Sequence, residues 1–117
     1  MKAIYKNILI EQGATFSSTL NVVDRNGDPV DLSTYAVRGT LGKSYTDASP
    51  IDFTCVITDA ATGEITFSLN SAETLALNTF NINRYVYDIE IYKDSAESGI
   101  EDITRVQEGI AIITPNI

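Results

Sequence analysis

The sequence predicts an all-β fold, an antiparallel β-sandwich of about seven strands with one short helical turn near residues 71–77. Apolar and polar residues alternate along several short segments, which is the pattern of strands with one buried and one solvated face. Turn-forming residues separate these segments at the spacing typical of sandwiches, and no amphipathic helix of three turns occurs. The 117 residues, 44% of them hydrophobic, are enough for one core, so we expect a single domain over residues 1–117.

The first third of the chain predicts two strands and a hairpin. Ile8 to Ile10 indicates a short strand, which ends at the polar residues that follow. From Phe16 to Val22 apolar and polar residues alternate, and the buried face is expected to hold Phe16, Leu20 and Val22. Asn26-Gly27 is the strongest short signal for a tight turn, because both residues tolerate positive φ. We therefore expect a hairpin there.

The middle of the chain predicts a strand, a long loop and an antiparallel pair. Val37 to Leu41 is expected to form the strand, and the polar segment Lys43 to Pro50 an exposed, mobile loop. Ile51 to Ile57 and Ile65 to Leu69 both alternate with period two, and the turn Asp59 to Gly63 joins them. This arrangement predicts two adjacent antiparallel strands.

The segment Gly63 to Leu77 changes its hydrophobic period halfway. After the strand, the apolar residues fall at helical spacing, namely Ala72, Leu75 and Ala76. Ser71 is the expected N-cap, and Thr74 stands where a capping box would have Glu. A strand that runs into one helical turn and then a loop predicts that the chain crosses to the second sheet here.

Two long strands are expected in the last third. Tyr85 to Lys93 alternates regularly, with Tyr85, Tyr87, Ile89 and Ile91 on one face. Residues 100–114 predict the last strand. Both of its faces carry apolar and charged residues, and a bulge near Glu108-Gly109, which would shift the phase of the alternation, resolves this conflict. In immunoglobulin-like domains a tyrosine at the start of the sixth strand bonds back to upstream backbone, and the residue two later points into the core. Tyr85 and Tyr87 fit these roles, so an immunoglobulin-like sandwich is expected.

Charge and composition narrow the function. The chain has 16 acidic and 8 basic residues and no His, which gives a net charge of -8. Such a surface repels phosphate backbones and anionic headgroups, so we expect no nucleic-acid and no membrane partner. Cys55 is the single cysteine, which excludes an intramolecular disulfide and a cysteine metal cluster. The apolar run Ile8 to Ile10 is too short for a signal-peptide core, and synthesis in a reducing cytoplasm is expected.

Few residues suggest catalysis or metal binding. Without His, the Ser-His-Asp and Cys-His arrangements are excluded. Asp88 and Glu90 share one strand face, and acid-base chemistry by this pair is an alternative to the solvated sheet face that we expect. Asp24 to Asp28 has oxygen ligands at alternate positions but lacks the Glu that closes a calcium loop, so a turn is expected. The sequence predicts no catalytic residues, no cofactor, no metal ligands and no enzyme activity.

Several segments, which together span nearly the whole chain, carry a family resemblance: Glu11 to Phe16, Asp24 to Leu41, Gly63 to Leu69 followed by Glu73-Thr74, Tyr85 to Ile89, and Glu108 to Pro115. In this order they resemble the immunoglobulin-like N-terminal domain of phage baseplate upper proteins. The resemblance implies a non-enzymatic virion structural protein that docks onto other tail or baseplate subunits. Family members usually carry a longer region after this domain, whereas this sequence stops at Ile117, so a small tail, baseplate or neck adaptor or accessory subunit is expected.

Assembly is expected to use sheet edges and exposed loops, and we expect a homo-oligomer. An edge strand presents unpaired backbone groups, so Ile8 to Ile10 or Ile110 to Ile113 is predicted to pair with a neighbouring subunit. The alternative function is a small carbohydrate- or receptor-binding module, in which Tyr45 and the loop Lys43 to Pro50 make the contacts.

Overall fold

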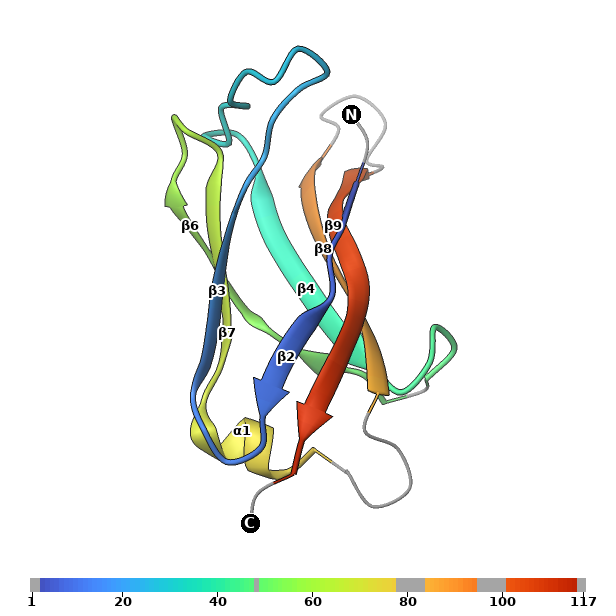
Figure 1. Cartoon of the computed structure of the whole chain (residues 1–117). Helices are drawn as coiled ribbons and strands as arrows, with labels where there is room; N and C mark the ends of the chain where they lie inside the picture. The colour runs from blue at the N-terminus through green and yellow to red at the C-terminus, as the bar shows by residue number, and fades with distance from the viewer. Residues whose placement is uncertain (1–2, 48, 78–83, 95–100, 116–117) are drawn as a thin grey trace.

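The computed structural model describes residues 3–47, 49–77, 84–94 and 101–115. These residues form two β-sheets packed face to face, which confirms the predicted immunoglobulin-like, all-β sandwich (Figure 1). The larger sheet has the order β1-β9-β8-β4-β5, with β2 also paired to β9, and the smaller sheet has the order β3-β7-β6. The elements are β1 (Ile4–Tyr5), β2 (Ile8–Glu11), β3 (Phe16–Asn21), β4 (Ala36–Gly42), β5 (Ile51–Asp52), β6 (Thr54–Asp59), β7 (Glu64–Leu69), α1 (Ser71–Leu75), β8 (Arg84–Asp94) and β9 (Glu101–Thr114).

The predicted strand Ile51 to Ile57 is divided between the two sheets. β5 pairs with β4 in the larger sheet, whereas β6 pairs antiparallel with β7 in the smaller one. Between them Phe53 is buried, and its N–H donates to the carbonyl of Gly39. Alternation with a period of two shows which side chains face inward, but it does not show which strand lies alongside. The sequence predicted that the whole segment Ile51 to Ile57 pairs with β7, which is correct for β6 and wrong for β5.

The first and last strands pair with each other. Ile8 to Glu11 lies parallel to β9, with Ile8 opposite Ala111 and Ile10 opposite Ile113. The predicted pairing of Ile110 to Ile113 with a neighbouring subunit is corrected, because this segment lies between β8 and β2. Among the described strands β2 pairs with β9 alone, so the pairing of Ile8 to Ile10 with a neighbouring subunit stays a prediction. The turn after β2 carries the chain to β3 in the other sheet (Figure 1).

The irregularity of the last strand lies earlier than predicted. Ile89 pairs with Gln107 and Glu90 pairs with Arg105, which leaves Val106 as the extra residue on β9. Both Val106 and Gln107 are buried, as expected where a bulge lets neighbouring residues turn inward. Glu108-Gly109 is in regular register and serves another purpose. A Cβ at Gly109 would collide with the carbonyl of Lys6, so glycine lets the segment between β1 and β2 approach β9 closely.

Four aromatic rings join the two sheets in the core. Phe67 of β7 packs edge-on against Phe53 at 5.2 Å and stacks with Tyr87 of β8 at 6.1 Å, measured between ring centroids. Phe16 of β3 completes the cluster. The predicted inward face of β8 is correct, because the four alternating residues are all buried: Tyr85, Tyr87, Ile89 and Ile91.

Tyr87 has a second role besides packing. Gln107 Nε2 donates a hydrogen bond to its hydroxyl at 3.0 Å, and the hydroxyl donates to the carbonyl of Lys6. Burial raises the pKa of Tyr87 above its ordinary value, so the phenol stays protonated and able to donate. Sequence reasoning treated Tyr87 only as a core residue, but it also contacts the upstream backbone between β1 and β2.

The short helix begins one residue earlier than predicted. Asn70 is the N-cap: its side chain accepts from the N–H of Glu73, and Glu73 accepts from the N–H of Asn70, which completes a capping box. Leu75, expected on an apolar face, is 54% exposed, whereas Thr74 is fully buried. The Thr74 hydroxyl accepts from the N–H of Gly13, and the carbonyls of Ala14 and Ser71, at 2.8 and 3.1 Å, share its single proton. The helix therefore holds the turn between β2 and β3.

Candidate functional site

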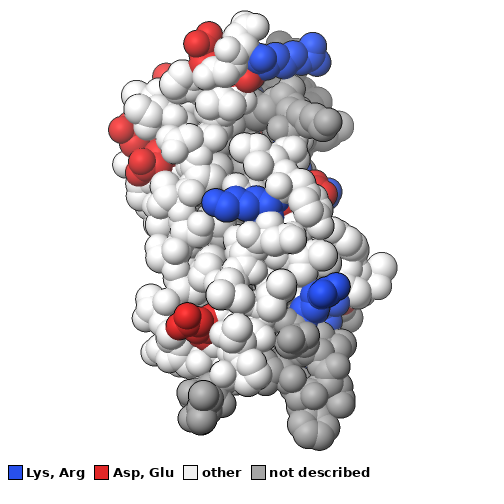
Figure 2. All heavy atoms as spheres, in the orientation of Figure 1, with Lys and Arg blue, Asp and Glu red and all other residues white. Residues whose placement is uncertain are grey.

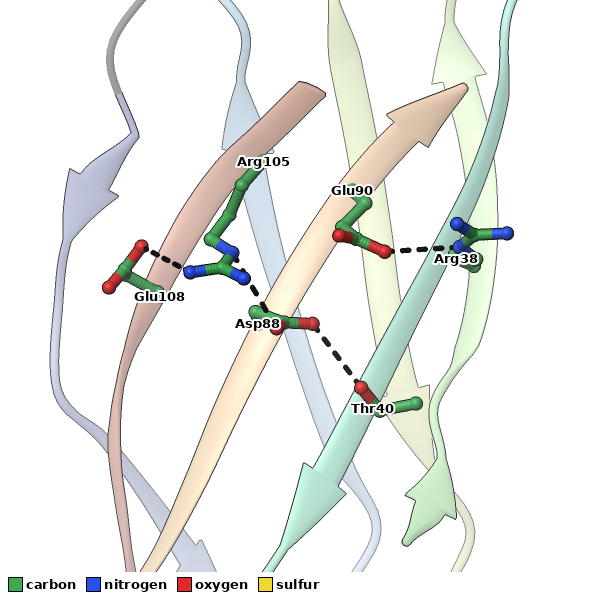
Figure 3. A network of polar contacts seen from close by, with 6 residues as sticks. All are labelled: Arg38, Thr40, Asp88, Glu90, Arg105 and Glu108. Carbon is green, nitrogen blue, oxygen red and sulfur yellow. Dashed lines mark hydrogen bonds and ion pairs between the residues drawn. The ribbon is translucent and has the colours of Figure 1, made fainter. Parts of the chain in front are cut away.

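The outer face of the larger sheet carries a band of charged side chains from three adjacent strands (Figure 3). Arg38 Nε lies 3.1 Å from Glu90 Oε1, and Arg105 lies between Asp88 Oδ2 at 3.6 Å and Glu108 Oε2 at 3.3 Å. The strand register explains the first pair, since Arg38 is directly opposite Glu90. Arg105 reaches from its position opposite Glu90 to Asp88 and Glu108, two carboxylates that lie directly opposite each other. Opposite charges at directly paired positions stabilise a sheet.

Asp88 is the most desolvated carboxylate of this band. Burial raises its pKa, and the negative charge of Glu90 adds to the rise, whereas Arg105 and a hydrogen bond from the Thr40 hydroxyl oppose it. Thr40 Oγ1 donates to Asp88 Oδ1 at 3.2 Å. Asp88 is therefore held by partners on both sides, from β4 and from β9 (Figure 3).

A cavity of about 120 Å³ lies next to Asp88, where the loop after β4 meets the sheet. Its lining consists of Thr40, Gly42, Ser44, Tyr45, Asp47, Pro50, Val86, Tyr87 and Asp88. The floor therefore comes from β4 and β8, and the wall comes from the loop that the sequence predicted to be exposed. Polar and aromatic groups both border the cavity, which is typical of binding sites.

Asp47 holds the loop in its shape. Its carboxylate accepts hydrogen bonds from the N–H groups of Lys43 and Ser49, each at 2.9 Å. These bonds lower the pKa of Asp47, so it stays ionised at neutral pH. Gly42 lies at the base of the loop, where a Cβ would be 3.0 Å from the carbonyl oxygen of Ser44, so a larger residue there would require the loop to shift.

Tyr45 is the most exposed large hydrophobic residue of the described chain, at 69%. It lies at the rim of the cavity, so the loop named in the alternative function does border a cavity. The sequence pointed to the loop through its length and its tyrosine. It gave no sign that Thr40 and Asp88 would complete the cavity, because those residues come from strands that are distant in the chain.

The other candidate residues have structural roles. Asp24 Oδ1 accepts from the N–H groups of Asn26 and Asp28, which confirms the predicted turn. Asp88 and Glu90 lie on one face, as predicted, but each is paired with an arginine. Beside this pair on β8, Tyr92 lies on the outer face of the sheet, where the guanidinium of Arg38 lies over its ring at 4.6 Å.

Two other features are absent from the described residues. Within those residues no three His, Cys, Asp or Glu side chains are gathered as metal ligands. No helix in the same part of the chain is both long and apolar enough to cross a bilayer.

The chain is similar to solved structures of other proteins in its fold alone. No family model matches the chain, and no curated protein matches it by sequence. A solved structure with a similar fold is AggA, the major subunit of aggregative adherence fimbriae type I from Escherichia coli. The TM-score is 0.42 at 11% identity, over 96% of this chain and 91% of AggA. This finding corrects the expected function as a phage tail or baseplate subunit, because the similar protein is a fimbrial subunit. The fimbrial role is a property of AggA and is not transferred to this chain.

Proposed function

We propose that this chain is a non-enzymatic protein-binding domain whose partner inserts a lysine or arginine side chain into the cavity beside Tyr45. The observation that carries the proposal is an exposed tyrosine at the rim of a cavity that two carboxylates, Asp47 and Asp88, also border. Tyrosine is enriched among the residues that dominate protein interfaces.

The size of the cavity favours a side chain over a whole small molecule. Sites for drug-sized ligands measure about 300 to 1,000 Å³, whereas this cavity measures about 120 Å³. One end of a long side chain fits such a volume, while the rest of the partner lies on the surrounding sheet face. A partner side chain that fills the cavity would form the buried, water-free centre of the interface.

The charge of the cavity favours a cation. Asp47 is kept ionised by two backbone N–H groups, and the band beside Asp88 in Figure 3 holds three carboxylates against two guanidinium groups. The Tyr45 ring adds a surface over which an ammonium or guanidinium group is attracted, by about 0.5 to 1 kcal/mol at exposed sites.

The chemistry of the described side chains supports a role without catalysis. The sequence has no His, and burial raises the pKa of the Cys55 thiol to about 11, so the thiol stays protonated at neutral pH. The two carboxylates that were candidates for acid-base chemistry, Asp88 and Glu90, are each paired with an arginine.

The experiment is an NMR titration of the ¹⁵N-labelled chain with blocked arginine, blocked lysine and blocked norleucine, which has a similar length and no charge. We expect the cations to shift amide signals of residues 40–47 and 86–88, and norleucine to shift them much less. Tyr45→Ala should weaken the cation affinity about two- to fivefold, which corresponds to the loss of about 0.5 to 1 kcal/mol.

Tyr5→Ala is the matched control, because Tyr5 is also exposed, at 62%, but lies on β1. It should leave the titration unchanged. Equal shifts with norleucine and arginine, or a cation affinity that Tyr45→Ala leaves unchanged, would contradict the proposal. Shifts of the same signals by monosaccharides but not by the cations would identify a sugar site instead.

A further inference from the structure

The outer strand of the smaller sheet, β3, has one open edge. Among the described strands it pairs with β7 alone. Just beyond β3, the N–H of Val22 donates to the carbonyl of Gly63 on the β7 side, at 2.8 Å. Backbone groups of successive residues point to opposite sides of a strand, so the even-numbered residues bond to β7. The N–H and C=O groups at the open edge belong to Ser17, Thr19 and Asn21.

This edge lacks the features that normally prevent strands from pairing with other molecules. No charged residue and no proline occurs between Glu11 and Asp24. The β3–β7 register is continuous, whereas β6, the opposite edge, has an irregularity between Ile57 and Asp59 and carries a charge at its end. Charges, prolines and bulges are the common protections of edge strands.

The surface around the open edge is also poor in charge. The outward residues of β3 continue into hydroxyl-bearing residues of β7 and β6, and Thr66 lies within 3.4 Å of Thr19 and 3.3 Å of Thr58. Figure 2, in the orientation that brings β2 and β3 to the viewer, shows mostly uncharged atoms between scattered acidic and basic groups. In a chain with a net charge of -8, this is a region where a second copy meets little repulsion.

We propose that β3 pairs antiparallel with β3 of a second copy, about a two-fold axis that passes through Thr19. In this register Ser17 lies opposite Asn21 of the partner, and Thr19 lies opposite its own copy. The open-edge residues are all odd-numbered, so the pairing matches each free N–H with a free C=O and forms one continuous six-stranded sheet. A two-fold interface must be self-complementary, and this strand meets that condition in shape, hydrogen bonding and charge.

The expected dimer is weak. One strand pair buries less area than the interfaces of about 1,200 to 2,000 Å² that hold stable complexes together. We therefore expect monomers at concentrations on the order of 5 μM and a substantial dimer population on the order of 500 μM. The repulsion between two acidic chains should make association stronger in 150 mM NaCl than at low salt.

The test is sedimentation velocity across this concentration range in 150 mM NaCl, together with hydrogen exchange. We expect the sedimentation coefficient to rise with concentration, and the amides of Ser17, Thr19 and Asn21 to become protected only at high concentration. Thr19→Lys should abolish both effects, because it places two ammonium groups opposite each other on the axis.

Thr58→Lys is the matched control. Thr19 and Thr58 are both exposed, and both contact Thr66 from strands on either side of β7, so the two variants carry the same charge on the same sheet face. Thr58 also donates to Glu64 at 2.8 Å, and a lysine there keeps a partner because it can pair with that carboxylate. The control variant should still dimerise, and circular dichroism should show both variants folded. A chain that stays monomeric at 500 μM would overturn the proposal. So would a dimer that Thr19→Lys leaves intact, or protection of the odd-numbered amides at every concentration.

Discussion

Replacement of Tyr87 by Phe tests the connection between the core and the N-terminal strand pair. The ring of Tyr87 is 2% exposed, and Phe keeps its packing against Phe67 and Phe53. What is lost is the hydroxyl, which accepts from Gln107 and donates to the carbonyl of Lys6. Gln107 then loses a hydrogen-bond partner at a buried position, and the carbonyl of Lys6 loses a donor at a partly buried one.

The expected cost follows from these unsatisfied partners. A buried polar group without a hydrogen bond costs about 1 to 3 kcal/mol, so Tyr87→Phe should lower the free energy of unfolding by about 1 to 3 kcal/mol. At about 4 °C per kcal/mol for a domain of this size, the melting temperature should fall by about 4 to 12 °C. The loss should fall mainly on β1 and the segment that leads to β2, because Lys6 lies there.

Urea unfolding measures the stability, and hydrogen exchange of the Lys6 amide, which donates to the carbonyl of Glu108, locates the change. Tyr45→Phe is the control, because its side chain is exposed and should change stability by less than about 0.5 kcal/mol. A loss below about 0.5 kcal/mol for Tyr87→Phe would show that water satisfies the two partners. That result would refute the reasoning.

The pH dependence gives a second measure of Tyr87. Burial raises its pKa, so ionisation is less favourable in the folded chain than in the unfolded one. The folded state then binds more protons above about pH 10, and stability falls as the pH rises through that range. Phe cannot ionise, so the stability difference between the two proteins should narrow above about pH 10.

Three further predictions test other parts of the fold. Thr74→Val should cost about 1 to 3 kcal/mol in urea unfolding, because it removes a buried hydroxyl with three backbone partners, whereas the exposed Thr34→Val should cost less than about 0.5 kcal/mol. Gly109→Ala should cost about 1 to 3 kcal/mol, since its Cβ would force the backbone at Lys6 to move; an unchanged melting temperature would contradict this close approach. The pKa of Cys55 is about 11, so about one thiol in a thousand is ionised at pH 8. Because only the thiolate reacts, Cys55 should react with a thiol reagent about a thousand times more slowly than a fully ionised cysteine. Reaction at the rate of the urea-unfolded chain would contradict this value.

Sequence reasoning succeeded where a local pattern decides the structure. Alternation fixed the inward faces of β7 and β8, because a half-buried strand requires every second side chain to be apolar whatever its neighbours are. Phe67 and Tyr87 could therefore be assigned to the core without knowledge of the sheet order. The turn at Asn26-Gly27 was likewise predictable, since Gly27 has the positive φ of +84° that this turn requires.

Sequence reasoning failed where the structure depends on which strands are neighbours. The change of sheet at Phe53 leaves alternation intact, so nothing local marks it. The bulge was predicted near Gly109, because glycine is a common bulge residue. The extra residue is instead Val106, and the glycine at position 109 is required by the close approach of Lys6. The cap at Asn70 was missed by one position, although Glu73 three residues later completes the capping box.

The same distinction explains why the cavity could not be predicted. Its floor exists only because Thr40 and Asp88 are paired in register across β4 and β8, and its wall exists only because Asp47 folds the loop back toward Gly42. The open edge of β3 belongs to the other sheet, with the aromatic core between the two. A ligand at the cavity and a second copy at the edge therefore contact different elements, and a dimer carries two cavities. Such a dimer can hold a partner with two cationic side chains more tightly than a monomer can, without any new contact at either cavity.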